Sequence, residues 1–381
     1  MSQLKVNTIR HTGASSDAVT LATDGTCTAK ITSNGGNQFA NRNKIINGEF
    51  RINQRSHSGS AGHNAYTLDR WKYSRSANTE FSTSQSTETP DGFANSVKMT
   101  SIGSNGSTGA GDYAYWRYHI EGQDLQDLNK GTSAAKAFTL SFYFKSDITG
   151  TFAISIQDEN SRMCNATYTV ADTNWNRYTI TIPADTSGAI ANSNATGLSI
   201  HFYIIAGSNH TSGSAVNTWA SYSASSVATG FTAHVTTNSV NHYLTGVQLE
   251  VSDYATPFEH LPYGVELARC KRYYQQYPEL ASDGYAPYPG NAVAIMTSTT
   301  AGWGLKFDTM RAAPTITWTG NHRIIEVDTA RAVTGITAGH LSASSAWMVL
   351  TCSGGGMTAG RAGLTGRNNS TSTYINLSAE L

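Results

Sequence analysis

Four aromatic residues stand close together in the stretch DYAYWRYHIEG, at Tyr113, Tyr115, Trp116 and Tyr118. If this stretch is a β-strand, alternation places Trp116 and Tyr118 on one face and Tyr113 and Tyr115 on the other. One pair can then face a core while the other faces solvent, where flat rings stack on the apolar faces of sugars. The alternative is that both pairs are structural, one in the core and one at a protein interface. The sequence therefore offers these four residues as a candidate carbohydrate-binding platform.

Catalytic side chains are harder to find in this sequence. Two carboxylate pairs could be proposed for glycoside hydrolysis, Asp158 with Glu159 and Asp253 with Glu259. Neighbours on a strand point to opposite faces, however, and the second pair falls in a connecting segment. The chain contains no GxSxG nucleophile elbow, no HExxH helix and no phosphate-binding glycine loop. We therefore expect no catalytic residues and no enzyme.

The four cysteines, Cys27, Cys164, Cys270 and Cys352, are far apart, with no CxxC spacing and no histidine near them at ligand spacing. This arrangement favours buried free thiols over a disulfide framework or a zinc site. We expect no metal and no cofactor.

Charge and hydropathy exclude several classes of partner. Of the 381 residues only 14% are charged, and 26 basic side chains balance 26 acidic ones without clustering. Nucleic acids and anionic membrane surfaces attract clustered cations, so we expect neither as a partner. No run approaches the roughly 20 apolar residues of a membrane span, and the amino terminus lacks the apolar core of a signal peptide. We expect synthesis in a cytoplasm and no membrane insertion.

The architecture that must position the aromatic residues is predicted to be all-β. Stretches such as FTLSFYFKS, TFAISIQDE and GLSIHFYIIAG alternate with period two, which is typical of half-buried antiparallel strands. We expect a central jelly-roll β-sandwich over residues 41–262 and a smaller C-terminal β-sandwich over residues 276–381. Between them, Leu267, Cys270, Lys271 and Tyr274 share one side of a short linking helix predicted over residues 263–275. Residues 1–40 contain short strands that cannot bury a core alone, so we interpret them as a segment for attachment and oligomerisation.

One stretch, NKIINGEFRINQR at residues 43–55, allows two readings. Asn47-Gly48 between alternating residues is a strong signal for a local hairpin. The same stretch could instead be the first strand of a sandwich, whose partner lies far along the chain.

Five stretches in register resemble the carbohydrate-binding-module-like jelly-roll domain of bacteriophage tail fibre and tail-associated proteins. They span residues 43–277, more than half the chain, and are NKIINGEFRINQRS, YTLDRWKYSR, YHIEGQDLQDLNKGTSAAKAFTLSFYFKSDITGTFAISI, NWNRYTITIPADTSG and YLTGVQLEVSDYATPFEHLPYGVELARCKRYYQQY. The leading LKVNTIRHTG is also similar to amino-terminal tags of virion structural proteins in marine phages. The resemblance implies that KIINGEF is the first strand and pairs with TGVQLE, with Asn47-Gly48 as a bulge or kink.

The resemblance also bears on calcium. Carbohydrate-binding jelly rolls of this kind often hold a structural calcium ion between the first and last strands, here around Gly48 and Glu49. The closing strand has Tyr243, Leu244 and Thr245 where a ligand-bearing version would offer Asp, so we expect no calcium.

The function that the resemblance implies is that of a tail fibre or receptor-binding protein, located on a tail appendage of the virion. Its expected partners are copies of itself in a homotrimer, other tail proteins through residues 1–40, and polysaccharide on the host surface. A purely structural virion protein, such as a capsid decoration, adaptor or fibre shaft, is the alternative, because a fold does not bring its ligand with it. An enzyme that degrades polysaccharide is the third hypothesis.

Overall fold

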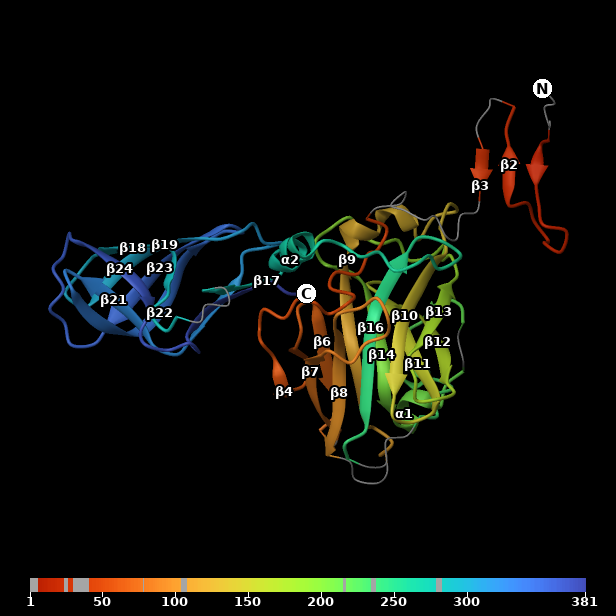
Figure 1. The fold of residues 1–381 in the computed structure, drawn as a ribbon, viewed down its shortest axis with the longest axis horizontal. Helices are drawn as coiled ribbons and strands as arrows, with labels where there is room; N and C mark the ends of the chain where they lie inside the picture. Colours follow the sequence, from red (N-terminus) through yellow and green to blue (C-terminus); the bar gives the residue numbers. More distant parts are fainter. Residues whose placement is uncertain are drawn as a thin grey trace.

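The computed structural model describes residues 6–23, 27–29, 41–77, 79–103, 108–214, 217–233, 238–278 and 283–381, with the backbone alone for residues 27–29 and 103. Figure 1 shows a small N-terminal sheet, a central sandwich and a C-terminal barrel. The predicted all-β class is confirmed.

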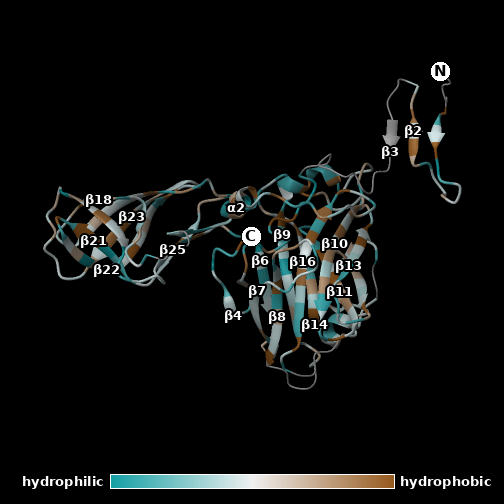
Figure 2. Cartoon of the chain, viewed as in Figure 1, coloured by the Kyte–Doolittle hydropathy of each residue, from teal (hydrophilic) through white to brown (hydrophobic). Residues whose placement is uncertain are grey.

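The N-terminal sheet has three antiparallel strands in the order β1-β2-β3. They are β1 (Thr8–Ile9), β2 (Val19–Leu21) and β3 (Cys27–Ala29). Figure 1 shows this sheet standing apart from the sandwich, and Figure 2 shows β2 as hydrophobic. Val6, Ile9 and Leu21 are 38%, 56% and 41% exposed. Residues 1–5, 24–26 and 30–40 of the predicted 1–40 segment lie outside the described residues.

The central domain consists of two sheets. One has the order β13-β10-β16-β8-β7-β4, with β4 (Ser58–Ser60), β7 (Glu80–Ser86), β8 (Ser96–Gly103), β10 (Phe138–Ser146), β13 (Asn176–Ile182) and β16 (Asn241–Glu250). The other has the order β15-β12-β11-β14-β9-β6-β5, with β5 (Ala65–Tyr66), β6 (Trp71–Arg75), β9 (Tyr113–Glu121), β11 (Gly150–Asp158), β12 (Arg162–Val170), β14 (Thr196–Ala206) and β15 (Ala220–Ser221). Because the chain crosses repeatedly between the two sheets, the predicted jelly-roll sandwich is confirmed.

The core of this domain lies between the two sheets. Phe142 of β10 meets Phe202 of β14 edge-on, with ring centroids 5.2 Å apart, and Trp71 of β6 lies 6.1 Å from Phe202. All three side chains are fully buried, and each such burial contributes about 1.5–3 kcal/mol. Figure 2 shows the hydrophobic and hydrophilic bands that alternate along the strands. The predicted inward face of FTLSFYFKS is therefore correct.

The segment that begins at Asn43 lies along the closing strand β16, which confirms the long-range pairing and excludes the local hairpin. The Lys44 amide donates to the Leu249 carbonyl at 2.9 Å, and the Val247 amide donates to the Gly48 carbonyl at 2.9 Å. Asn47 has a φ of 59°, so the chain kinks there and no regular strand forms. A Cβ at Gly48 would lie 2.2 Å from the Val247 carbonyl oxygen, so only glycine allows this approach.

The predicted linking helix is present but shorter than expected. It is α2 (Tyr263–Lys271), and Tyr274 already belongs to strand β17 (Tyr274–Tyr277). The prediction that Tyr274 is helical is wrong because its backbone pairs with β25 (Tyr374–Ser378). The sequence did not predict three further short helical segments in the described residues: η1 (Gly122–Leu128), α1 (Ser208–Thr211) and η2 (Ala224–Ser226). Of the helices in the described parts of the chain, none is long and apolar enough to cross a membrane.

The C-terminal strands form a closed barrel beside a small three-stranded sheet, where the sequence predicted a second sandwich. The barrel order is β18-β19-β23-β22-β21-β24, and the small sheet is β17-β25-β20. The strands are β18 (Pro287–Ile295), β19 (Thr300–Lys306), β20 (Thr315–Thr319), β21 (His322–Glu326), β22 (Thr329–Leu341), β23 (Ser345–Cys352) and β24 (Ala362–Arg367). Trp303, Ile324 and Leu350 fill the barrel interior and are fully buried. Alternation is the same in a sandwich and a barrel, so it cannot reveal that β18 pairs with β24 and closes the sheet.

The C-terminal end of the chain lies beside the sandwich (Figure 1), where Glu380 connects the two domains. Glu380 accepts from Arg70 at 2.6 Å and from Arg55 at 3.0 Å, and all three side chains are buried or nearly so. The Arg70 guanidinium lies 3.5 Å from the ring centre of Tyr273, and that of Arg55 lies 3.6 Å from the ring centre of Tyr274. A second buried carboxylate, Glu121, pairs with Arg272 at 2.9 Å.

Candidate functional site

The four aromatic residues predicted as a platform all lie on β9, and the strand separates them into two pairs. Trp116 and Tyr118 point into the core and are 0% and 1% exposed, respectively. Tyr113 and Tyr115 lie on the outer face and are half-buried. The prediction is therefore corrected for Trp116 and Tyr118, because side chains enclosed between two sheets are not available to a surface ligand.

Tyr115 is the centre of a stack of rings on the outer face of the seven-stranded sheet. Its ring lies 4.8 Å from that of His201 with an interplanar angle of 3°, and 5.5 Å from that of Tyr113 at 22°. Tyr203 adds a tilted contact at 4.9 Å. We call Tyr113, Tyr115, His201 and Tyr203 the aromatic stack.

The stack forms because two strands distant in sequence are neighbours in the sheet. In the register of β9 and β14, Tyr115 stands opposite Tyr203 and Arg117 stands opposite His201. Outward positions on both strands alternate with the core residues between them, so the four rings fall on one face. On its other side β9 pairs with β6, which places Ser74 opposite Tyr115.

Three groups of the stack, His201, Tyr115 and Tyr203, are uncharged near neutral pH. Burial lowers the pKa of His201 well below its ordinary value, and the nearby Arg117 guanidinium lowers it further. Burial raises the pKa of the Tyr115 hydroxyl, and it raises that of Tyr203 well above the ordinary value. A neutral array of rings suits a neutral ligand better than an ionic one.

His201 combines burial with an incomplete set of hydrogen bonds. The side chain is 4% exposed, and its Nδ1 lies 3.3 Å from the amide nitrogen of Gln157. Among the residues that the structure describes, its Nε2 has no partner. The parallel contact with Tyr115 fixes the plane of the tyrosine ring, so His201 is a positioning residue for the stack.

Loops rise beside the stack at one end of the sheet. The Gly207 amide donates to the Asp112 carbonyl at 2.8 Å, which fixes the start of the loop after β14, and Asn165 of β12 donates to the Ser226 carbonyl at 2.8 Å, which fixes the turn η2. Tyr222, just before η2, is 49% exposed. Tyr222 also interacts electrostatically with Tyr115, since its hydroxyl helps to raise the pKa of Tyr115.

Two of the four stack residues were missed from the sequence. In GLSIHFYIIAG, His201 and Tyr203 alternate with the core residues Ile200 and Phe202. Alternation alone therefore predicts that His201 and Tyr203 point to the outer face of the sheet. Their meeting with Tyr115 depends on the pairing of β14 with β9, about 80 residues apart in the chain.

Of the carboxylates considered for catalysis, Asp158, Glu159 and Glu259 are engaged in structural contacts, and Glu259 accepts the Asn43 amide at 3.0 Å. Asp158 pairs with Lys130 at 2.5 Å and accepts the amides of Asn160 and Arg162. Glu159 accepts the Ala191 amide.

The described residues contain no group of three or more His, Cys, Asp or Glu side chains arranged to hold a metal ion. At the position where the resemblance would place calcium, the Glu49 carboxylate faces Arg51 at 3.2 Å and His260 at 3.2 Å. The side chains of Cys164, Cys270 and Cys352 are buried, and none of the three forms a disulfide; the side chain of Cys27 lies outside the described part of the chain.

Comparisons with known proteins give no assignment by sequence. No model of a protein family matches the chain, and no curated protein matches it. Among solved structures, the enzymatically active domain of tailspike protein 4 from bacteriophage CBA120 matches with a TM-score of 0.30 and 12% identity, over 55% of this chain and 22% of that one. A family 22 carbohydrate-binding module from Clostridium thermocellum Xyn10B matches with a TM-score of 0.30 and 11% identity, over 57% of this chain and 99% of that one. These scores are too low to establish a relationship, and the jelly-roll assignment rests on the strand order described above.

Proposed function

We propose that this chain is a virion protein of the tail-fibre type and that its sandwich binds a glycan on the host surface. The observation that supports glycan binding is the aromatic stack on the outer face of the seven-stranded sheet. Aromatic rings present flat apolar surfaces that match the C–H faces of a sugar, and they add little entropy cost when they are already fixed.

The ring of Tyr115 is held before any ligand arrives. Contacts with Tyr113, His201 and Tyr203 surround it on the sheet, so binding does not have to order a free side chain. Ordering such a side chain costs about 0.5–1.5 kcal/mol, and a preformed platform avoids this cost. In the proposed mechanism, the sugar packs against the accessible ring edges of Tyr113 and Tyr115, while Arg117 and the Tyr222 hydroxyl bond its hydroxyl groups.

The N-terminal sheet supports the proposal of an oligomeric, attached protein. Its strands have two or three residues each, and Ile9 and Leu21 are exposed on it. So short a sheet is not stable alone, and it requires a partner to cover its apolar side chains. We propose a homotrimer fixed to other tail proteins through this sheet. Several weak glycan sites per particle would then act together and raise the overall affinity by about 10²–10⁴-fold.

We propose binding without catalysis. Asp158 and Glu159 already serve the loops around Lys130 and Ala191, so neither is free to protonate a glycosidic oxygen.

A purely structural role in the virion is the second candidate. Tyr113 and Tyr115 are half-buried, which also suits rings that are covered by another protein. In that case the outer face of the sandwich would join virion proteins to one another.

A microarray of bacterial surface polysaccharides tests the glycan proposal. We expect the full chain to bind a subset of the array and Tyr115→Ala to weaken this binding by about tenfold or more, the effect of losing roughly 1.4 kcal/mol. The control is Tyr285→Ala, because Tyr285 is an exposed tyrosine of the C-terminal domain, at 46%, and lies outside the stack. Array binding that is equal in the wild type and in Tyr115→Ala would contradict the assignment of the stack.

Electron microscopy of intact particles, labelled with antibody against residues 276–381, tests the location. Label at the tips of tail appendages supports the tail-fibre role. Label on the capsid shell or close against the tail wall supports the structural role instead.

A further inference from the structure

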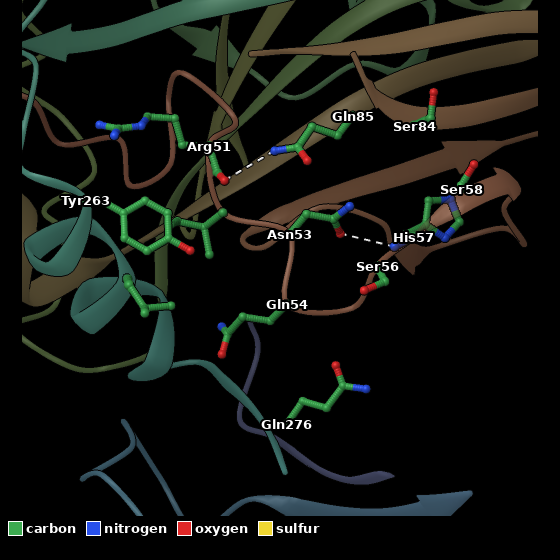
Figure 3. A pocket seen from close by; sticks show the side chains of 12 residues that line it. Arg51, Asn53, Gln54, Ser56, His57, Ser58, Ser84, Gln85, Tyr263 and Gln276 are labelled. Carbon is green, nitrogen blue, oxygen red and sulfur yellow. Dashed lines mark hydrogen bonds between the residues drawn. The ribbon is translucent and has the colours of Figure 1, made fainter. Parts of the chain in front are cut away.

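A cavity of about 500 Å³ lies at the joint between the sandwich and the C-terminal domain, away from the aromatic stack. Figure 3 shows that its walls come from the loop 51–58, from β7, from helix α2 and from strand β17. Its volume is within the range of roughly 300–1,000 Å³ that is typical of small-molecule sites.

The lining of this joint cavity is rich in amide and hydroxyl groups. Asn53, Gln85 and Gln276 contribute amides, and Ser58 and Ser84 contribute hydroxyls. Among the described residues, the side chains of Ser58, Ser84 and Gln276 have no hydrogen-bonding partner in the protein. An amide beside a hydroxyl offers both donors and acceptors at close spacing, which matches the neighbouring hydroxyls of a sugar ring.

An aromatic ring completes the cavity on the side of α2. Tyr263 is 45% exposed, and the Arg51 guanidinium lies 5.6 Å from its ring centre. Figure 3 shows Tyr263 at the edge of the cavity. The exposed part of its ring can pack against the C–H face of a sugar.

The charges at the cavity indicate a neutral ligand. None of the described residues that line the cavity carries a carboxylate, and the guanidinium of Arg51 is already shared with Glu49 at 3.2 Å. Burial lowers the pKa of His57, whose Nε2 lies 2.7 Å from the Thr83 hydroxyl, so this imidazole is neutral near pH 7.

The walls of the cavity are fixed with respect to one another. The Gln54 amide nitrogen donates to Asp69 at 2.6 Å and to the Tyr274 carbonyl at 2.9 Å, which ties the loop 51–58 to β17. The Gln85 amide nitrogen donates to the Arg51 carbonyl at 3.2 Å and to the carbonyl of Phe50, just before the loop, at 2.6 Å, which ties the loop to β7. Such a cavity does not need to be ordered by its ligand.

We infer that the joint cavity is a second saccharide-binding site, with a neutral mono- or disaccharide as its ligand. The Tyr263 ring stacks on the sugar, and Gln276, Ser58 and Ser84 bond its hydroxyl groups. The inference rests on the proposed function, because it assigns a further site for the same class of ligand. A saccharide in this cavity would touch the sandwich, α2 and β17 together and so stiffen the joint.

The test is saturation-transfer-difference NMR with the full chain and the methyl glycosides of glucose, galactose, N-acetylglucosamine and mannose at millimolar concentration. Five proteins are compared: the wild type, Tyr263→Ala, Gln276→Ala, Tyr115→Ala and a control. Tyr285→Ala is the matched control, since Tyr285 is 46% exposed and also lies beside a guanidinium, that of Arg323 at 4.6 Å. We expect Gln276→Ala to weaken binding of at least one glycoside by about three- to tenfold, the effect of one lost hydrogen bond. Tyr263→Ala should weaken it at least as much, while Tyr285→Ala leaves it unchanged; Tyr115→Ala separately reports any binding at the aromatic stack.

The other outcomes overturn the inference in distinguishable ways. Signals that are lost in Tyr115→Ala but retained in Tyr263→Ala and Gln276→Ala would overturn the joint site and leave the proposed function intact. An absence of signal from all four glycosides would overturn the joint site as stated, and the microarray would then decide the proposed function separately.

Discussion

Replacing Glu380 should loosen the joint between the sandwich and the C-terminal domain. This carboxylate is 4% exposed and lies between Arg70 and Arg55, whose side chains are 1% and 13% exposed. In Glu380→Ala, Arg55 keeps Asp69 at 3.8 Å. Arg70 keeps only the His119 carbonyl and the faces of tyrosine rings, so a buried positive charge is left without a counter-charge.

The magnitude follows from the geometry of the pair. Two unit charges 4 Å apart interact with about 4 kcal/mol at an effective dielectric constant of 20. Removing one partner of a buried pair costs about 3–5 kcal/mol in practice. We therefore expect Glu380→Ala to lower the free energy of opening of β17 and β25 by that amount. Glu380→Gln keeps the shape and loses the charge, so its effect should be nearly as large.

Native-state hydrogen exchange measures this opening directly. The amides that pair β17 with β25 should exchange about two to four orders of magnitude faster in both variants. Glu88→Ala is the control, because Glu88 pairs with Lys145 at 2.8 Å but is 47% exposed, and such surface pairs contribute about 0–1 kcal/mol. If Glu380→Ala changes exchange no more than Glu88→Ala does, the reasoning about the buried cluster is wrong.

Two further predictions concern the sandwich. Gly48→Ala should lower the free energy of unfolding of the sandwich by more than about 1–3 kcal/mol, because the added methyl group overlaps the Val247 carbonyl. The control is Gly264→Ala in helix α2, where the added methyl group has open space, so the change should be neutral or stabilising by up to about 1 kcal/mol. Thermal unfolding measures both variants. His242 is fully buried, and burial lowers its pKa from 6.5 to about 3. Between pH 6.5 and pH 3 this histidine is therefore protonated in the unfolded chain and neutral in the folded one, so the free energy of unfolding falls as the pH drops below 6.5. Between pH 8 and pH 5 the wild type should lose about 2 kcal/mol more than His242→Phe in urea unfolding, and equal losses would contradict the assignment.

The strands of the sandwich could be predicted because the alternation of apolar residues is a local property. Phe138, Leu140, Phe142 and Phe144 are spaced for one face of a strand, and all four are 2% exposed or less. The pairing of the Asn43 segment with β16 was predicted by resemblance, since the local Asn-Gly signal alone favoured a hairpin. Long-range pairing depends on how the whole core packs, so it cannot be predicted from the local sequence of the Asn43 segment or of β16.

Other features could not be obtained from periodicity. The barrel closes by pairing β18 with β24, which alternation does not specify. Helix α2 ends at Lys271 because Tyr274 is required in β17, a tertiary constraint that overrides the local helical pattern. Of the aromatic stack, Tyr113 and Tyr115 were predicted, whereas His201 joins them only through the register of β9 and β14.

The central claim is that a glycan lies on the aromatic stack, and hydroxyl-radical footprinting tests it most directly. The full chain is oxidised with and without a polysaccharide that it binds on the array, and the modification of each tyrosine is measured by mass spectrometry. The account predicts that bound glycan protects Tyr115 and Tyr113 from oxidation and leaves Tyr285 unchanged. If the polysaccharide binds and the oxidation of Tyr115 and Tyr113 does not change, the glycan does not lie on the stack and the claim is contradicted.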